Sequence, residues 1–128
     1  MQRRRVRSGS PYEAAYGFAR AVRVGNRVLV AGTAPIPPPG EEPATGAYGQ
    51  MLRCGEIALG AIESAGAGPG DVVRTRMFIV DPDDADEVGR AHGELFGDAV
   101  PVATMVVVAA LLDPAWLVEI EVEAIVEE

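Results

Sequence analysis

Three glutamates near the carboxyl end, Glu119, Glu121 and Glu123, alternate with apolar residues in the segment LVEIEVEAIV (117–126). Residues two apart lie on the same face of a β-strand, so this spacing predicts a row of carboxylates on one side of a sheet. Neighbouring carboxylates raise one another's proton affinity, and burial adds to that effect. A carboxylic acid held near neutrality is suited to moving protons on and off a bound water. The row is a candidate for acid–base chemistry, with a solvated strand face as the alternative.

The cations that could balance this row are all arginines. Eleven arginines and nineteen acidic residues give a net charge of −8, and the chain has no lysine, one histidine and one cysteine. The absence of lysine excludes a Schiff-base or lysine-nucleophile mechanism. A His/Cys metal cluster cannot be built from one chain, and we expect no metal and no other cofactor. Such an acidic chain repels nucleic acid at physiological salt, even with four arginines among residues 3–7.

Other residues with reactive side chains have plain structural interpretations. Arg74 and Arg76 alternate within residues 72–80, and we expect them to neutralise the glutamate row rather than to bind a ligand. His92 falls on an apolar helix face, where a packed histidine is more common than a catalytic base. Cys54 falls on the apolar stripe of another helix and is expected to be a small core residue.

A single α+β domain, residues 1–128, accounts for the pattern of elements. The length and the 48% apolar content fit one domain, and no apolar run is long enough to span a membrane. Gly25-Asn26 is typical of a hairpin turn, and five prolines between positions 35 and 43 predict a stiff surface loop. The apolar spacing predicts a short first strand near Val6, strands at 20–24, 27–31, 72–80, 104–112 and 117–126, and helices at 47–65 and 81–96.

These elements, in the order β-β-α-β-α-β-β, predict one mixed sheet with both helices on one face. Residues 105–110 (MVVVAA) are apolar on both sides of their strand, which is typical of a strand covered on both faces. The chain has no further element to cover the second face. We therefore expect a homo-oligomer packed sheet to sheet; half-exposed alanines and valines in a monomer are the alternative.

Five pieces of the chain occur in the same order in a known family. They are SGSPYE (8–13), GFARAVRVGNRVLVAGTA (17–34), Gln50, DVVRTRMFIVD (71–81) and PVATMVVVAALLDPAWLVEIEVEAI (101–125). As an ordered set covering nearly the whole chain, they resemble the YjgF/RidA (reactive intermediate deaminase, Rid) family, also called endoribonuclease L-PSP-like. The resemblance implies a chorismate-mutase-like fold in a homotrimer. The three sheets would line a central barrel, with ligand clefts between subunits.

The best-known members of that family hydrolyse reactive enamines and imines, such as 2-aminoacrylate, to the ketone and ammonia. Their Pro-Ala-Arg-Ser motif carries an arginine that binds the substrate carboxylate through two parallel hydrogen bonds. Here residues 101–104 read PVAT, which places Ala103 at the arginine's position, and a methyl group cannot bind a carboxylate. The chain thus resembles a branch that lacks this arginine. The family glutamate that positions a water matches Glu121, and an N-terminal family tyrosine matches Phe18.

The first hypothesis is a cytoplasmic homotrimer that binds a small metabolite in each cleft and hydrolyses an imine, an enamine or a related activated compound. The single cysteine fits a reducing compartment. Glu121 would position or activate water, backbone N–H groups near 101–104 would hold the developing charge, and Glu119 and Glu123 would be structural. Arg20 is the first candidate for a substitute anion-binding group. The expected substrate-binding residues are Phe18, Arg20, Gly32, Thr33, Val102, Ala103 and Thr104.

The sequence is also compatible with two other functions. The second hypothesis is a non-catalytic binding or regulatory module that uses the same cleft, which Ala103 and Phe18 favour because both remove polar groups. The third is a ribonuclease or translation inhibitor, ranked last because the chain is acidic and has neither an aromatic stacking platform nor paired histidines. The expected partners are a small molecule and two further copies of the chain, with no nucleic acid and no membrane.

Overall fold

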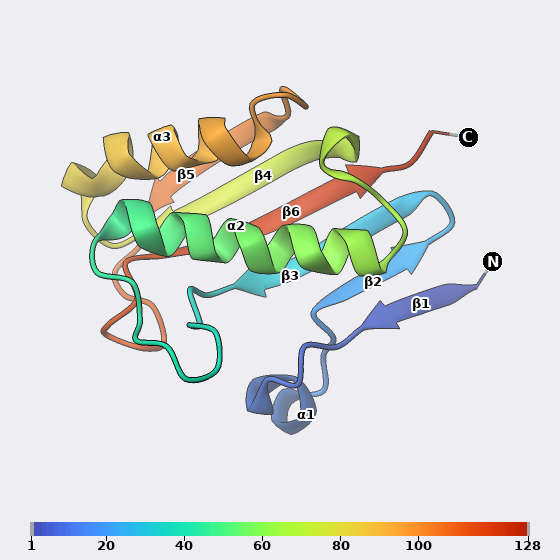
Figure 1. The fold of residues 1–128 in the computed structure, drawn as a ribbon, viewed down its shortest axis with the longest axis horizontal. Coiled ribbons are helices and arrows are strands. Elements are labelled where there is room, and N and C mark those ends of the chain that lie inside the picture. Colours follow the sequence, from blue (N-terminus) through green and yellow to red (C-terminus); the bar gives the residue numbers. More distant parts are fainter. Residues whose placement is uncertain (1, 128) are drawn as a thin grey trace.

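The computed structural model describes residues 2–127 and shows a mixed sheet with two longer helices lying along it (Figure 1). Its elements are β1 (Arg3–Val6), α1 (Pro11–Tyr16), β2 (Ala21–Val24), β3 (Arg27–Thr33), α2 (Ala47–Ser64), β4 (Val72–Ile79), α3 (Ala85–Phe96), β5 (Val102–Val107) and β6 (Val118–Ile125), with 3-10 turns at Pro69–Asp71 and Pro82–Asp84. The six strands lie in the order β1-β2-β3-β6-β4-β5. Neighbouring strands are antiparallel except β4 and β5, which are parallel.

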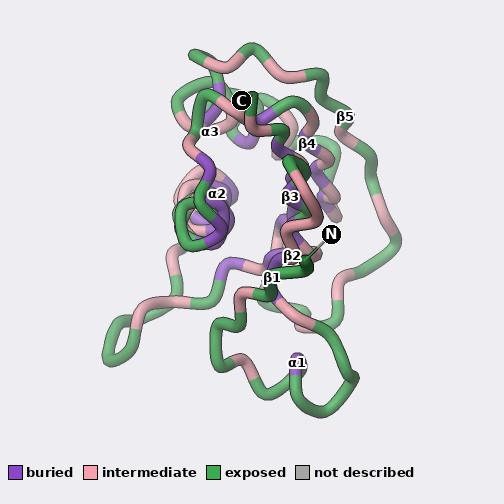
Figure 2. Tube along the Cα trace, turned by 90° about the vertical axis from the view of Figure 1, so that its right-hand side faces the viewer, coloured by how far each residue is buried: buried purple, intermediate pink, exposed green. Residues whose placement is uncertain are grey.

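Most predicted elements are confirmed, because their sequence signals are local. The short first strand near Val6 is β1, and Gly25 turns the β2–β3 hairpin with φ 61°, a left-handed conformation that suits glycine. The Asp81 side chain accepts a hydrogen bond from the backbone N–H of Asp83 (2.9 Å), at the start of the turn that leads into α3. The two predicted helices, α2 and α3, pack on the same face of the sheet (Figure 2).

Two elements differ from the prediction. The helix α1 has no predicted counterpart; it begins after Ser10, whose hydroxyl accepts a backbone hydrogen bond, and it is only six residues long. β5 covers 102–107 instead of 104–112. Within the described chain it pairs only with β4, which ends at Ile79, and the Val108 N–H makes the last contact there, 2.8 Å from the Ile79 carbonyl oxygen. The rest of the apolar run therefore forms a loop that leads to β6.

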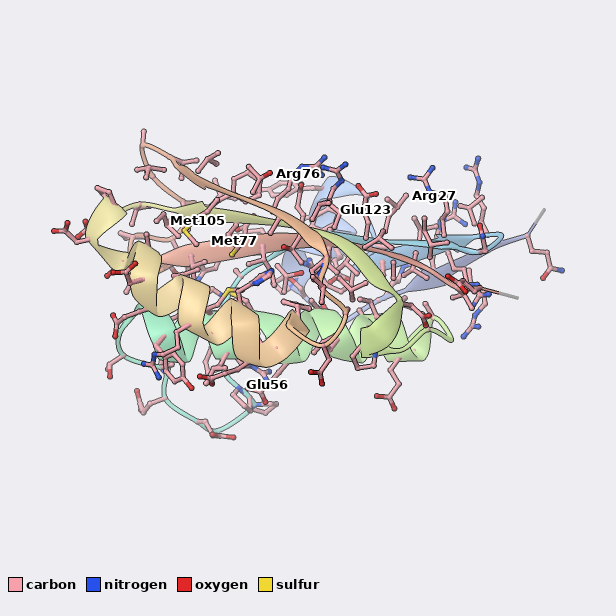
Figure 3. All side chains as sticks on the ribbon, turned by 90° about the horizontal axis from the view of Figure 1, so that it is seen from above. Arg27, Glu56, Arg76, Met77, Met105 and Glu123 are labelled. Carbon is pink, nitrogen blue, oxygen red and sulfur yellow. The ribbon has the colours of Figure 1, made fainter. Side chains whose placement is uncertain are left out.

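The hydrophobic core lies between the sheet and the two long helices. Ile120 and Val122 face this core from the centre of β6, and Cys54 of α2 is fully buried in it, as predicted. No helix in residues 2–127 packs on the opposite face, which carries the glutamate row of β6 and the arginines of β4. Figure 3 shows Arg76 and Glu123 on that open face, on the side away from the helices.

Candidate functional site

A pocket of about 590 Å³ lies where the α1 region, the proline-rich loop and the loop before β6 meet. Its surface is mostly apolar, and it is closed on the inner side by the ends of β3 and β6 and by α2. A concave apolar site with a few converging polar groups is the usual form of a small-molecule pocket. The apolar side chains that line it include Phe18, Ile36, Ile57, Leu112 and Trp116.

Glu119 lines this pocket from β6. Its side chain is half-buried, and this burial raises its pKa above the usual 4.5; Arg20 opposes the rise and the neighbouring charge of Glu121 adds to it. The backbone of β3 passes close by, because a Cβ at Gly32 would lie 2.5 Å from Glu119 Oε2. Glycine at this position therefore gives the carboxyl group its space. A carboxylic acid in such surroundings is a proton donor at a higher pH than an exposed one.

Arg20 is held inside the protein by its own neighbours. Its Nε donates to Glu13 Oε2 (3.3 Å), and its Nη1 donates to the carbonyl oxygen of Gly32 (2.5 Å) and to Thr33 Oγ1 (3.1 Å). Burial would raise the pKa of Glu13, but hydrogen bonds from Ser8 and Arg20 outweigh it and hold that pKa below its usual value. This buried ion pair ties the α1 region to β3, so Arg20 is largely occupied as a structural group.

Four of the predicted site residues meet at this pocket, namely Phe18, Arg20, Gly32 and Thr33. Glu121 does not line it. Glu121 lies on the open face of the sheet in a shallow groove that it shares with Phe18, and its carboxylate is 3.4 Å from Arg76 Nη1. Arg76 also approaches Glu123 (3.6 Å), which confirms its predicted role in neutralising the glutamate row.

The predicted β5 residues lie apart from the pocket within one chain. β6 and β4 lie between β5 and β3, so two strands separate Gly32 from Val102, Ala103 and Thr104. All three β5 side chains are exposed at the edge of the sheet. In the parallel register Ala103 pairs with Thr75, whose side chain faces the helices, and the side chain of Ala103 therefore points to the same side. Within the single chain, residues 101–104 therefore do not line this pocket.

His92 and Cys54 occupy structural positions. The Nε2 atom of His92 is 2.7 Å from the hydroxyl of Thr75, a buried residue of β4, and burial lowers the pKa of the imidazole. Burial raises the pKa of the Cys54 thiol far above the range in which a thiolate forms. Within residues 2–127, no group of three or more His, Cys, Asp or Glu side chains is placed to hold a metal ion. No helix of that range is long and apolar enough to cross a membrane.

Two charged residues that line the pocket, Glu119 and Arg53, lie outside the predicted site. Glu119 belongs to the glutamate row, and the sequence predicts a structural role for it. Its closeness to Gly32 depends on an irregular pairing of β3 with β6 that the sequence does not reveal. Arg53 reaches the pocket from α2, beside the proline-rich loop. Its helical position is readable from the sequence, whereas the path of that loop is not.

The sequence profile described as Endoribonuclease L-PSP matches residues 9–126. The chain belongs to this family. A crystal structure of a Mycobacterium tuberculosis member of the YjgF/YER057c/UK114 family superposes with a TM-score of 0.90 at 41% identity, covering 98% of this chain and all of the other. The α+β, chorismate-mutase-like fold implied by the family resemblance is thereby confirmed.

The curated relatives include proteins of known and unknown function. An uncharacterised protein of Streptomyces coelicolor is 45% identical over 121 residues, covering 94% of this chain and 90% of the relative. The 2-iminobutanoate/2-iminopropanoate deaminase of Escherichia coli is 32% identical over 112 residues and 84% of each chain. The relative with the higher identity thus has no assigned activity, and the named deaminase is more distant.

Proposed function

We propose that this Rid-family chain hydrolyses a small imine or enamine in the pocket beside β3 and β6, with Glu119 as the proton donor. One observation carries the proposal: a half-buried carboxyl group with a raised pKa lines an apolar pocket next to Gly32. The deaminase name of a 32% identical relative supports the reaction class. The overall reaction is R₂C=NH + H₂O → R₂C=O + NH₃.

The carboxyl group of Glu119 would transfer its proton to the imine nitrogen, which makes the imine carbon a better electrophile. Water adds to that carbon, and its proton returns to the carboxylate. A second transfer from Glu119 to nitrogen lets ammonia leave with the C–N electron pair, while the hydroxyl proton of the intermediate restores the acid. An enamine enters the same path after protonation at carbon. The charge of Glu121 helps to raise the pKa of Glu119. Because Glu121 does not line this pocket, Glu119 alone carries the proton transfers of the proposed path.

We further propose that the working form is a homotrimer whose sheets pack against one another. The open face and the β5 edge support this, because Val102, Val106 and Val107 are 60%, 42% and 54% exposed in the single chain. Packing of a second copy would remove these side chains from water. In this assembly residues 101–104 of one copy would approach the pocket of another, and Ala103 would contribute no arginine to it.

The test is turnover of 2-iminobutanoate generated in solution, followed by release of 2-oxobutanoate and ammonia. We expect the wild-type protein to exceed the rate in buffer, and Glu119→Gln to reduce kcat at least about 100-fold, the usual contribution of a positioned acid or base. Glu63→Gln is the matched control, because Glu63 is exposed on α2 away from the pocket. Turnover that Glu121→Gln abolishes and Glu119→Gln leaves unchanged would move the acid–base role to Glu121.

A non-catalytic binding module in the same pocket is the second candidate, favoured by the occupation of Arg20 in its ion pair with Glu13. It predicts ligand binding without turnover. A wild-type protein that consumes imines, neutral or anionic, no faster than buffer would support this candidate and contradict the hydrolase.

A further inference from the structure

A second arginine lines the pocket, and its surroundings differ from those of Arg20. Arg53 lies on α2, and its side chain is only 24% exposed. Its Nε donates a hydrogen bond of 2.6 Å to the carbonyl oxygen of Ile36 in the proline-rich loop. That bond fixes the plane of the guanidinium group at the pocket wall, since Ile36 lines the pocket as well.

The outer nitrogens of Arg53 are available for a ligand. Among residues 2–127, neither Nη1 nor Nη2 donates a hydrogen bond to a protein acceptor, and the nearest carboxylate is that of Glu56, 4.0 Å from Nη1. Glu56 is one turn along the same helix and 63% exposed, so this pair is a weak surface interaction that a better-placed anion replaces. A guanidinium with one nitrogen anchored and two free is suited to bidentate binding of a carboxylate.

The other arginines near the expected site are unsuited to this role. Arg20 is committed to Glu13, Gly32 and Thr33. Arg74 and Arg76 do not line the pocket, and Arg76 pairs with Glu121 and Glu123 of the glutamate row. Of the two arginines that line the pocket among the described residues, Arg53 is the one for which neither Nη1 nor Nη2 donates a hydrogen bond, whereas Nη1 of Arg20 donates two.

We infer that Arg53 is the anion anchor of the pocket, and that the ligand is a small 2-imino or 2-oxo acid whose carboxylate docks on the wall formed by α2 and the proline-rich loop. The inference rests on the proposed function for the identity of the pocket as the ligand site. It places the carboxylate away from residues 101–104, where Ala103 offers no charge. Burial raises the pKa of Glu119, so its carboxyl group keeps its proton to a higher pH than an exposed one, which lessens its repulsion of an anionic ligand.

The test measures binding and therefore does not depend on turnover. 2-Oxobutanoate, the stable product acid, is titrated into the wild-type protein by calorimetry, with uncharged methyl 2-oxobutanoate as a second probe. We expect wild type to bind the acid more tightly than the ester. Arg53→Gln should lower the affinity for the acid at least about tenfold and leave the affinity for the ester unchanged. Arg90→Gln, which removes a 58% exposed arginine of α3 outside the pocket, should bind both probes like wild type.

Each outcome is decisive for the anchor. Equal binding of the acid by wild type and Arg53→Gln, or no preference of wild type for the acid over the ester, overturns it. If Arg53→Gln fails to fold, Arg53→Lys is the second variant, because it keeps the charge but loses the paired donors. Weaker binding of the acid by Arg53→Lys, with unchanged binding of the ester, still supports the anchor. If binding of the acid depends on Arg53 but the protein does not turn over imines, this inference stands and the hydrolase proposal fails.

Discussion

At the scale of the residue, three side chains carry the proposals: Glu119 with its raised pKa, Arg20 in its buried ion pair, and Arg53, whose Nη atoms donate no hydrogen bond within residues 2–127. The sequence indicates the glutamate row and its common face. Choosing between neighbouring members of that row requires their distances to β3, which depend on how two strands distant in sequence pair. The pocket supports the proposal that Glu119 transfers the proton, whereas the family resemblance implies a water-positioning glutamate at Glu121.

Gly32→Ala tests the proximity of β3 to Glu119. An added Cβ would lie 2.5 Å from Oε2, and the carboxyl group, at the end of a flexible side chain, would swing aside. Imine turnover should fall at least about tenfold, since a small misplacement of a catalytic group is costly. The free energy of unfolding should change by less than about 1 kcal/mol. Gly60→Ala, with open space around its Cβ, is the control, and equal activities of the two variants would contradict the expected contact.

His92 predicts a pH dependence of stability. Burial lowers its pKa in the folded protein, so the unfolded chain binds the proton more readily. The stability that neutral His92 contributes is therefore fully present above pH 6.5, the ordinary histidine pKa. It is lost as pH falls below that pKa. Urea unfolding at pH 7.5 and 5.5 should show a smaller loss for His92→Gln than for wild type. An identical loss in both proteins would mean that the histidine titrates normally.

At the scale of the element, the hairpin, α2, α3, β4 and the face of β6 are all predictable, because turn residues and apolar spacing are local signals. The helix α1 was missed, since its six residues carry too few apolar repeats to show a period. The end of β5 was misplaced because an edge strand stops where its partner β4 stops, and sequence alone does not reveal the partner. The path of the proline-rich loop, and with it Arg53 at the pocket wall, depends on contacts of the same long-range kind.

Gln50 joins three segments around the pocket region and provides an element-scale prediction. Its Nε2 donates to the carbonyl oxygens of Ala44 (3.3 Å) and Ala115 (3.0 Å), and its Oε1 accepts from the N–H of Leu117 (2.7 Å). Gln50→Met keeps the size but leaves these backbone groups without partners. Urea unfolding should show a loss of about 1–3 kcal/mol. A loss under about 0.5 kcal/mol would mean that water satisfies these groups equally well.

At the scale of the whole molecule, one face of the sheet is covered by helices and the other is open in the single chain (Figure 2). The open face combines paired charges, such as Arg76 with Glu121, and exposed valines at the β5 edge. The net charge of −8 makes non-specific self-association unfavourable, so assembly requires a specific match of surfaces.

Light scattering tests the proposed trimer. At micromolar concentration wild type should give about 40 kDa, which is three times the 13.4 kDa of one chain. Val106→Asp should shift the mass toward 13 kDa, because a buried unpaired charge at the packed face is costly. Val106→Thr, whose side chain has nearly the same shape as valine, should give a mass closer to that of wild type. A wild-type mass near that of one chain would rule out the assembly.

The central claim, that a protonated Glu119 drives imine hydrolysis, is tested most directly by the pH dependence of kcat/KM for 2-iminobutanoate in wild type and Glu119→Gln. Burial raises the pKa of Glu119 above 4.5. The protonated, active form of this carboxyl group is present below that raised pKa and disappears as pH rises through it. We predict a wild-type rate that declines with rising pH through that pKa, a Glu119→Gln rate that is low and lacks this decline, and a Glu63→Gln profile like that of wild type. Superimposable profiles for wild type and Glu119→Gln would contradict the account.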